Sequence, residues 1–303
     1  MKRRTFLKQT AAAGALAGVG SFGLYSFSPE EKRKHITILH TNDVHSHIEP
    51  FEPTDAKFPN QGGVARRYTL INNIRKENPN TLLLDAGDIF QGTPYFNFYG
   101  GELEFKLMSK MGYDAATIGN HDFDNGIDGL YAQLPHAHFQ FLSANYDFSN
   151  TVMDGQSKPY KVFTKDGIKI GVFGLGIELE GLVGKKLFKE TQYLDPVEIA
   201  TDTVRVLKEE ENCHLVICLS HLGYHYRNEK ISDLKLAGLT KDIDLIVGGH
   251  THTFLDRPTV TKNSEGKNML INQVGWAGLN LGRIDFYLDD SGKSSAEGTT
   301  ILV

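Results

Sequence analysis

Apolar and polar positions alternate in blocks along the chain from residue 35 onward. Apolar runs that end in polar residues occur at 35–43, 81–88 and 115–122. Stretches with helical spacing of the apolar residues follow at 62–80 and 101–114. Short apolar runs bounded by turn residues predict buried strands, and their alternation with helices predicts an α/β protein with a largely parallel first sheet.

The second half of the chain continues this alternation. It predicts one hairpin, one helix and two buried strands: 160–177 with its turn at Asp166-Gly167, 195–212 with Asp195 as its cap, 214–221, and 243–250. After residue 258 the pattern changes to short strands with turns, which predicts antiparallel β structure that closes a second sheet. We find no repeat and no biased linker, so 35–303 is predicted to be a single domain.

The first 34 residues differ in composition from the rest. A basic start, an Ala/Gly-rich apolar stretch and a polar exit follow one another, and the stretch RRTFLK at 3–8 resembles a twin-arginine export signal. The apolar stretch is short and rich in glycine for a membrane span. We therefore expect 1–34 to direct export to the periplasm or another extracytoplasmic space, with membrane attachment only if the signal is not cleaved.

The charge of the predicted domain excludes one class of partner. The first 34 residues carry seven Lys/Arg and two Asp/Glu, a net charge of +5, so the chain total of −5 leaves −10 on 35–303. Such an acidic body argues against binding long nucleic acids through their phosphates, while a small phosphorylated substrate held by metal ions remains compatible. The two cysteines, Cys213 and Cys218, are five positions apart and are not expected to pair.

Five of the apolar runs end in polar clusters. They are Asp43-Val44-His45, Asp85-Ala86-Gly87-Asp88, Gly119-Asn120-His121-Asp122, Ser220-His221 and Gly248-Gly249-His250-Thr251-His252. Ligands of open α/β sheets bind at the carboxyl ends of the strands, and this mixture of imidazole, carboxylate and amide suits Zn, Mn, Fe or Co. So many ligands exceed the need of one ion and predict two cations that share a carboxylate.

The local spacing adds two expectations. The pairs Asp43/His45 and His250/His252 are each two positions apart, so an extended chain would point both members of a pair to one side. Glycines precede Asp88, Asn120 and His250, where the backbone is expected to turn sharply or to approach another group closely.

Taken together, LHTNDVHSH, LDAGDIFQGTPYFN, IGNHDFDNG, LSHLGY and GGHTHTF resemble the calcineurin-like metallophosphoesterase superfamily, and more narrowly its 5′-nucleotidase branch. The resemblance covers nearly all of the chain after residue 35. It implies a four-layer αββα fold, and a phosphohydrolase in which hydroxide bridging two divalent metals attacks phosphorus.

The resemblance also implies a role for each site residue. Asp43, His45 and His252 would hold one metal, Asn120, His221 and His250 the other, and Asp88 would bridge them. His121 would stabilise the transition state and assist the leaving oxygen, and Asp124 would orient its ring. Asn120 and His121 would also contact the substrate phosphate.

Five further features have simpler expectations. His40 is expected to be a structural hydrogen-bonding side chain, and His47 and His225 to lie behind the ligands or in solvent. Asp85 is expected to support the site through hydrogen bonds. The aromatic run at 94–101 fits core packing better than a wall that stacks on substrate.

The resemblance is partial, because long members of the branch carry a C-terminal domain that recognises the nucleotide. We expect this chain to lack that domain, so that a separate chain supplies it, or the chain acts alone with broad specificity, or its substrate is not a nucleotide. A 5′-nucleotidase-like phosphomonoesterase is the favoured hypothesis. The alternatives are a phosphodiesterase on cyclic or dinucleotide substrates, a thiosulfohydrolase-like enzyme, and a metal-binding subunit without catalysis.

Overall fold

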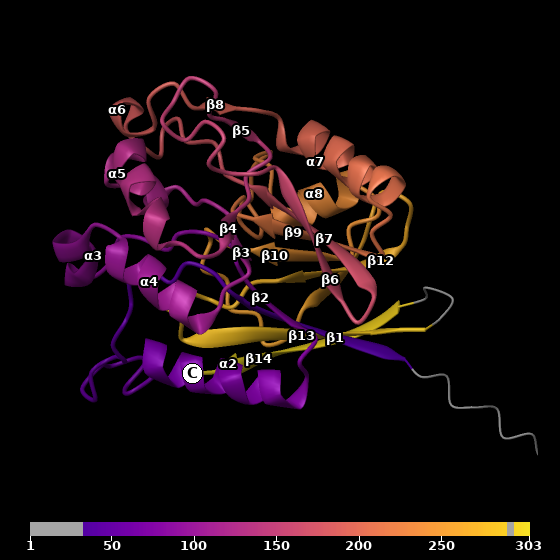
Figure 1. Cartoon of the computed structure of the whole chain (residues 1–303), viewed down its shortest axis with the longest axis horizontal. Coiled ribbons are helices and arrows are strands. Elements are labelled where there is room, and N and C mark those ends of the chain that lie inside the picture. The colour runs from indigo at the N-terminus through magenta and orange to yellow at the C-terminus, as the bar shows by residue number, and fades with distance from the viewer. Residues whose placement is uncertain (1–32, 290–293) are drawn as a thin grey trace, which may run out of the picture. The chain divides into compact units, whose positions relative to one another are not determined.

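Two six-stranded sheets face each other in the computed structural model, which describes residues 33–289 and 294–303 (Figure 1). Positions 1–32 of the predicted export signal lie outside the described residues. No helix among the described residues is long and apolar enough to cross a lipid bilayer.

The first sheet has the strand order β14-β13-β1-β2-β3-β4, and the second has the order β11-β12-β10-β9-β7-β6. The first contains β1 (Lys34–Thr41), β2 (Thr81–Asp85), β3 (Ala115–Ala116), β4 (Gln140–Phe141), β13 (Asn280–Leu288) and β14 (Ser294–Leu302). The second contains β6 (Tyr160–Lys165), β7 (Ile168–Leu175), β9 (Leu215–Ser220), β10 (Leu245–Gly248), β11 (Thr259–Lys262) and β12 (Asn268–Asn272). A separate pair joins β5 (Tyr146–Asp147) to β8 (Gln192–Tyr193).

Alternation along the strands builds the layers. In β2, Leu82 and Leu84 pack between the sheets with Val172 and Ile217 of the second sheet, whereas Leu83 joins the core on the outer face. Because successive side chains of a strand point to opposite faces, a strand that is apolar throughout must be covered on both sides. Both outer faces are therefore covered by helices.

The helices divide between these outer faces. The α-helices are α2 (Val64–Glu77), α3 (Pro94–Tyr99), α4 (Glu102–Met111), α5 (Gly126–Gln133), α6 (Lys185–Phe188), α7 (Pro196–Arg205) and α8 (Asp233–Leu239). The 3-10 helices η1 (His121–Phe123) and η2 (Leu134–His136) and the π-helical segment η3 (Val206–Glu210) accompany them. Ile71 of α2 and Phe105 of α4 pack on the first sheet, and Val204 of α7 and Leu236 of α8 on the second. In Figure 1, α2 and α7 lie on these opposite outer layers. The predicted four-layer αββα fold is thereby confirmed.

Two predicted local structures are also confirmed. The hairpin β6–β7 turns at Asp166 and Gly167, both with positive φ, as a tight two-residue turn requires. Helix α7 begins at Pro196, and the Asp195 carboxylate accepts hydrogen bonds from the N–H groups of Val197 and Glu198 at 2.8 and 3.0 Å.

The expectation for the chain after residue 258 is partly wrong. β11 and β12 do extend the second sheet, but β12 runs parallel to β10. β13 and β14 join the first sheet instead, where β13 lies antiparallel to β1. Ile284 and Phe286 of β13 thereby enter the core between the sheets. An alternating pattern specifies that a strand has a buried face, and the choice of sheet depends on packing partners far away in sequence.

The capping role of Asp195 at the start of α7 can be tested by mutation. Asp195→Ala is expected to lower the free energy of unfolding by about 1 kcal/mol, since two N–H groups at the helix start lose their acceptor. Urea unfolding measures the change. The control is Asp202→Ala, an exposed aspartate within the same helix, for which we expect a change within about 0.5 kcal/mol. Equal effects of the two changes would contradict the capping role.

Candidate metal centre

The loops that follow five parallel strands of the two sheets meet in one site. Asp43 and His45 follow β1, Asp88 follows β2, Asn120 and His121 follow β3, His221 follows β9, and His250 and His252 follow β10. β1, β2 and β3 run parallel in the first sheet, and β9 and β10 run parallel in the second. Parallel strands present their carboxyl ends at one edge, which is where α/β sheets bind their ligands.

Three of the predicted ligands form a first cluster. The ligand atoms of Asp43, His45 and His252 lie within 4.8 Å of one another. Nε2 of His45 is 3.0 Å from Nε2 of His252, and the latter is 3.5 Å from Oδ1 of Asp43. Nδ1 of His45 faces the carbonyl oxygen of Phe90 at 3.1 Å. A proton on Nδ1 satisfies that carbonyl and leaves the lone pair of Nε2 directed at the cluster.

Asp88, His221 and His250 form a second cluster, also with ligand atoms within 4.8 Å. Nδ1 of His221 faces the carbonyl oxygen of Ala86 at 2.6 Å, which again leaves Nε2 for the site. Nδ1 of His250 lies 2.8 Å from Oδ1 of Asn120. The Asn120 amide, which the resemblance implies for this metal, thus lies against one member of the second cluster.

Asp88 of the second cluster also approaches the first cluster. Its Oδ2 atom is 3.0 Å from Nε2 of His221 and 3.8 Å from Nε2 of His45. Its Oδ1 atom accepts the backbone N–H of His121 at 2.8 Å. This position fits the bridging role that the resemblance implies, and the structure brings all seven predicted ligands together.

The charges and donors of this set fit divalent cations. Asp43 and Asp88 are completely buried. Burial of the His221 ring opposes its protonation, yet Asp88 and Asp43 raise its pKa to about 10. Nε2 of His221 is buried 3.0 Å from Oδ2 of Asp88 but makes no well-directed hydrogen bond within the described residues, a costly state for a polar atom. Buried carboxylates and an imidazole nitrogen that needs a partner suit a pair of cations with mixed N/O ligation.

The backbone of the site corrects one expectation. Five predicted ligands have left-handed backbone, with φ of 49° at Asp43, 50° at His45, 55° at Asp88, 71° at His250 and 51° at His252. Such φ values cost about 1 kcal/mol each outside glycine and concentrate at functional sites. The predicted extended conformation of the two ligand pairs is therefore wrong. The left-handed turn sends His250 to the second cluster and His252 to the first.

The glycines before Asp88, Asn120 and His250 are predicted to allow a sharp turn or a close approach, and both are found. Gly87 has a φ of 86°, so it turns the chain before Asp88. Gly119 allows close approach instead, because a Cβ atom there would lie 2.2 Å from Oδ1 of Asp88. A Cβ atom at Gly249 would lie 2.8 Å from both the Ala86 carbonyl oxygen and Nδ1 of His221.

His121 lies beside the clusters without belonging to either. Its Nδ1 is 2.8 Å from Oδ2 of Asp124, the residue that directly follows η1. That hydrogen bond is the main cause that raises the pKa of His121 above its ordinary value. The His121 ring also packs edge-on against His45, with ring centroids 5.2 Å apart. The geometry matches the pairing predicted for His121 and Asp124, whose catalytic roles stay a prediction.

Asp122 is a supporting residue to which sequence reasoning gave no role. Its Oδ1 accepts the N–H groups of Ile89 and Phe90 at 2.9 and 3.1 Å. Its Oδ2 accepts those of Asp88 and Gly119 at 3.1 and 2.8 Å. One buried carboxylate thus fixes the backbone on which Asp88 stands. The only available signal was its place directly after His121, because hydrogen bonds to backbone leave no trace in sequence.

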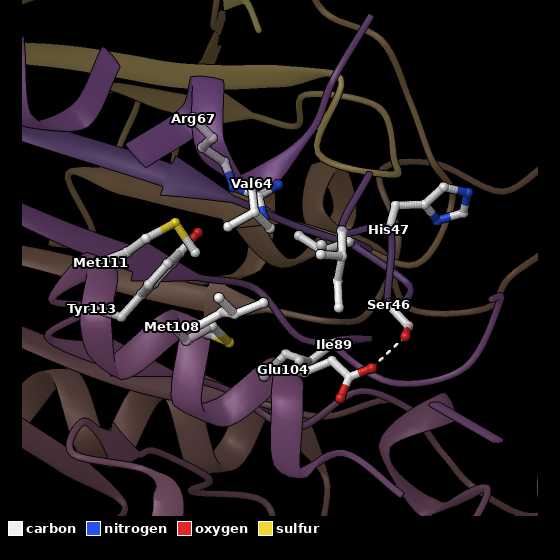
Figure 2. Close-up of a pocket in the computed structure, with 12 residues that line it drawn as sticks. Ser46, His47, Val64, Arg67, Ile89, Glu104, Met108, Met111 and Tyr113 are labelled. Carbon is white, nitrogen blue, oxygen red and sulfur yellow. Dashed lines mark hydrogen bonds between the residues drawn. The ribbon is translucent and has the colours of Figure 1, made fainter. Parts of the chain in front are cut away.

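A second support lies beneath the loop that carries His45. The Ser46 hydroxyl donates to Glu104 of α4, and the Thr93 hydroxyl donates to the Ser46 carbonyl at 2.8 Å. Figure 2 shows the Ser46–Glu104 hydrogen bond at one end of a small cavity of about 20 Å³, with Arg67 at the other end. Both ends are polar and buried, and Oε2 of Glu104 and Nε of Arg67 have no hydrogen-bond partner in the described part of the chain.

The remaining candidates lie away from the ligand atoms. His40 is fully buried with Nε2 2.9 Å from Nδ2 of Asn272, and burial lowers its pKa to about 3, as expected for a structural side chain. Asp85 is buried and accepts the N–H of Gly87 at 2.9 Å, in line with its predicted supporting role. His225 is exposed.

The aromatic run at 94–101 forms α3 and is divided between core and surface. Phe96 packs into the core on the first sheet. Phe98 and Tyr99 are 82% and 52% exposed. Core packing therefore accounts for only part of the run.

Comparison with known proteins agrees with the site. A family model described as calcineurin-like phosphoesterase matches residues 36–254. The chain is 35% identical to the trifunctional nucleotide phosphoesterase protein YfkN of Bacillus subtilis over 91% of this chain. Among solved structures, the 5′-nucleotidase precursor from Thermus thermophilus gives a TM-score of 0.80 at 36% identity over 89% of this chain. The NAD nucleotidase NadN of Haemophilus influenzae gives 0.78 at 27% identity over 89%.

These relatives are longer than the chain. The match spans 20% of the Bacillus protein, 55% of the Thermus chain and 57% of the Haemophilus chain.

Removal of the Asp122 carboxylate tests whether it supports the site. Asp122→Ala leaves four N–H groups without their acceptor, so we expect a loss of unfolding free energy of about 3 kcal/mol. We also expect metal affinity to fall about 10- to 100-fold, since the backbone that holds Asp88 loosens. Urea unfolding of metal-free protein and metal titration measure the two effects.

The matched control is Asp128→Ala, which removes an exposed carboxylate that pairs with Lys189 on the surface. We expect both quantities to stay near those of the native protein. Full metal affinity and stability in Asp122→Ala would show that Asp122 is dispensable.

Proposed function

The chain belongs to the calcineurin-like phosphoesterase family, and from this premise we propose that it is a dinuclear-metal phosphomonoesterase of the 5′-nucleotidase type. Its substrates would be nucleoside monophosphates or similar small phosphate esters. Relatives named as nucleotidases and nucleotide phosphoesterases support nucleotide phosphate esters as the substrate class.

The observation that carries the proposal is the position of His121 relative to both clusters. Its backbone N–H donates to Asp88, its ring contacts His45 of the first cluster, and its neighbour Asn120 contacts His250 of the second. A phosphate held across both clusters would therefore meet the Asn120 amide and the His121 ring. Two polar side chains aimed at a dinuclear site suit hydrolysis of a phosphate ester.

Metal binding and proton transfer would be carried out by different side chains of the site. Asp43, His45 and His252 would hold one cation, Asn120, His221 and His250 a second, and Asp88 would contact both. When bound, the two cations supply activated water near neutral pH and neutralise charge on the phosphoryl oxygens. Asp124 fixes the His121 ring through Nδ1, which leaves Nε2 to hold the proton that the departing oxygen receives.

Phosphate release from AMP tests the proposal. We expect Mn²⁺-loaded protein to release phosphate from AMP, and His121→Ala to lower kcat by about 10²–10⁴-fold, the usual contribution of general acid catalysis. Metal content should stay unchanged, since His121 is not among the proposed ligands. The assay measures phosphate release and metal content on the same samples.

His225→Ala is the matched control, because it removes an exposed histidine outside the clusters. Bis(p-nitrophenyl) phosphate, run beside AMP, separates phosphodiesterase from phosphomonoesterase activity. Turnover of the diester alone would contradict the monoesterase assignment, and metal-replete protein with no turnover of either would contradict catalysis.

We also propose that the chain is exported through the twin-arginine route, on the basis of RRTFLK at 3–8. Conversion of Arg3 and Arg4 to lysine keeps the charge and removes the arginine pair. We expect this Lys-Lys variant of the full chain to accumulate inside the cell. Fractionation of a bacterium with an active twin-arginine system measures this. Undiminished export of the Lys-Lys variant would contradict this route.

A further inference from the structure

A groove of about 530 Å³ opens along the loop that follows His45 of the first cluster. Residues 47–55 form one side and 93–95 the other. The first side begins two positions after His45, and the Thr93 hydroxyl joins the two sides through the Ser46 carbonyl. This volume lies within the range of small-molecule sites, which is about 300–1,000 Å³.

Aromatic rings connect the groove to the first ligand cluster. His47 and Phe51 line the groove and stack on each other, with ring centroids 5.2 Å apart and planes 18° apart. Trp276 contacts both rings edge-on at 5.1 and 6.0 Å, and it stacks on His252 at 5.8 Å. In Figure 2 the His47 ring points away from the cavity beneath its loop. These contacts fix an aromatic wall in place and reduce the entropy lost when a planar ligand stacks on it.

The acidic groups that line the groove are all hydrogen-bond acceptors. Glu49, Glu52 and Asp55 line it, and no lysine or arginine is among its described lining residues. Tyr95 lies on the opposite side and donates its hydroxyl proton to Glu49 at 3.3 Å. Asp55 also accepts the N–H of Lys57 at 2.8 Å. The groove therefore favours a ligand that supplies hydrogen-bond donors and repels one that carries further negative charge.

We propose that this groove holds the leaving group of the ester, and that it fits the nucleoside of a nucleoside monophosphate. The base would stack between the wall of His47 and Phe51 on one side and Tyr95 on the other, and the sugar hydroxyls would donate to the carboxylates. Nucleoside di- and triphosphates would be poorer substrates, because their leaving groups bring phosphates to Glu49 and Glu52. This inference rests on the proposed function and locates nucleoside recognition in this chain.

The test compares AMP, ribose 5-phosphate and ATP as substrates. The ratio of kcat/KM for AMP to that for ribose 5-phosphate is expected to fall about tenfold in Phe51→Ala and in Tyr95→Ala, mainly through KM for AMP, as loss of one stacking ring predicts. Glu49→Gln is expected to raise kcat/KM for ATP relative to AMP, since it removes one negative charge from the groove. The control is Phe98→Ala, an exposed aromatic of α3 outside the groove, and should leave both ratios unchanged.

Calorimetric binding of adenosine adds a measurement that needs no turnover. We expect the Kd of adenosine to rise about tenfold in Phe51→Ala and to stay unchanged in Phe98→Ala. If Phe51→Ala and Tyr95→Ala keep the ratio of kcat/KM for AMP to that for ribose 5-phosphate, the groove assignment is overturned. The proposed function then still stands, because phosphate esters are still hydrolysed. If no ester is hydrolysed, the proposed function fails, and the adenosine measurement alone still supports or overturns the groove.

Discussion

The buried carboxylates Asp43 and Asp88 are the constraint on which the rest of the site depends. A carboxylate removed from water is tolerated only when donors or cations surround it. Oδ1 and Oδ2 of Asp43 receive the backbone N–H of His250 at 2.9 and 3.0 Å, and Asp88 receives that of His121. Each donor belongs to the loop of another site residue. The need to hydrogen-bond the two buried carboxylates therefore sets where these loops lie. These hydrogen bonds offset the cost of the left-handed backbone at the ligands.

Contacts of these carboxylates also cross between the sheets, from Asp43 to the His250 N–H and from Asp88 to His221. Asp43 and Asp88 follow strands of the first sheet, whereas His221 and His250 follow strands of the second. The charged groups at this edge hold together two layers that apolar side chains hold together elsewhere. A change that weakens the site is thus expected to loosen the packing of the sheets at this edge as well.

Much of this arrangement could be predicted from sequence, because strand ends and ligand types are local signals. The polar clusters after apolar runs indicated where the site lies, the family resemblance implied which seven residues would be ligands, and residue type indicated the cap at Asp195. The sheet that β13 joins could not be predicted, since its pairing with β1 links residues about 250 positions apart. The role of Asp122 was also hidden, because its four partners are backbone N–H groups. The left-handed ligands were missed because short-range spacing suggests extended chain and carries no information on φ.

Cys213 and Cys218 have a consequence for where the fold is stable. Both thiols are free and buried, and burial raises the pKa of each above its ordinary value. Little thiolate is present at neutral pH, and thiolate is the species that reacts with oxidants or disulfides. The covalent structure of the described chain is therefore indifferent to the redox potential around it. A fold of this kind can be completed in a reducing compartment and then work in an oxidising one without rearrangement.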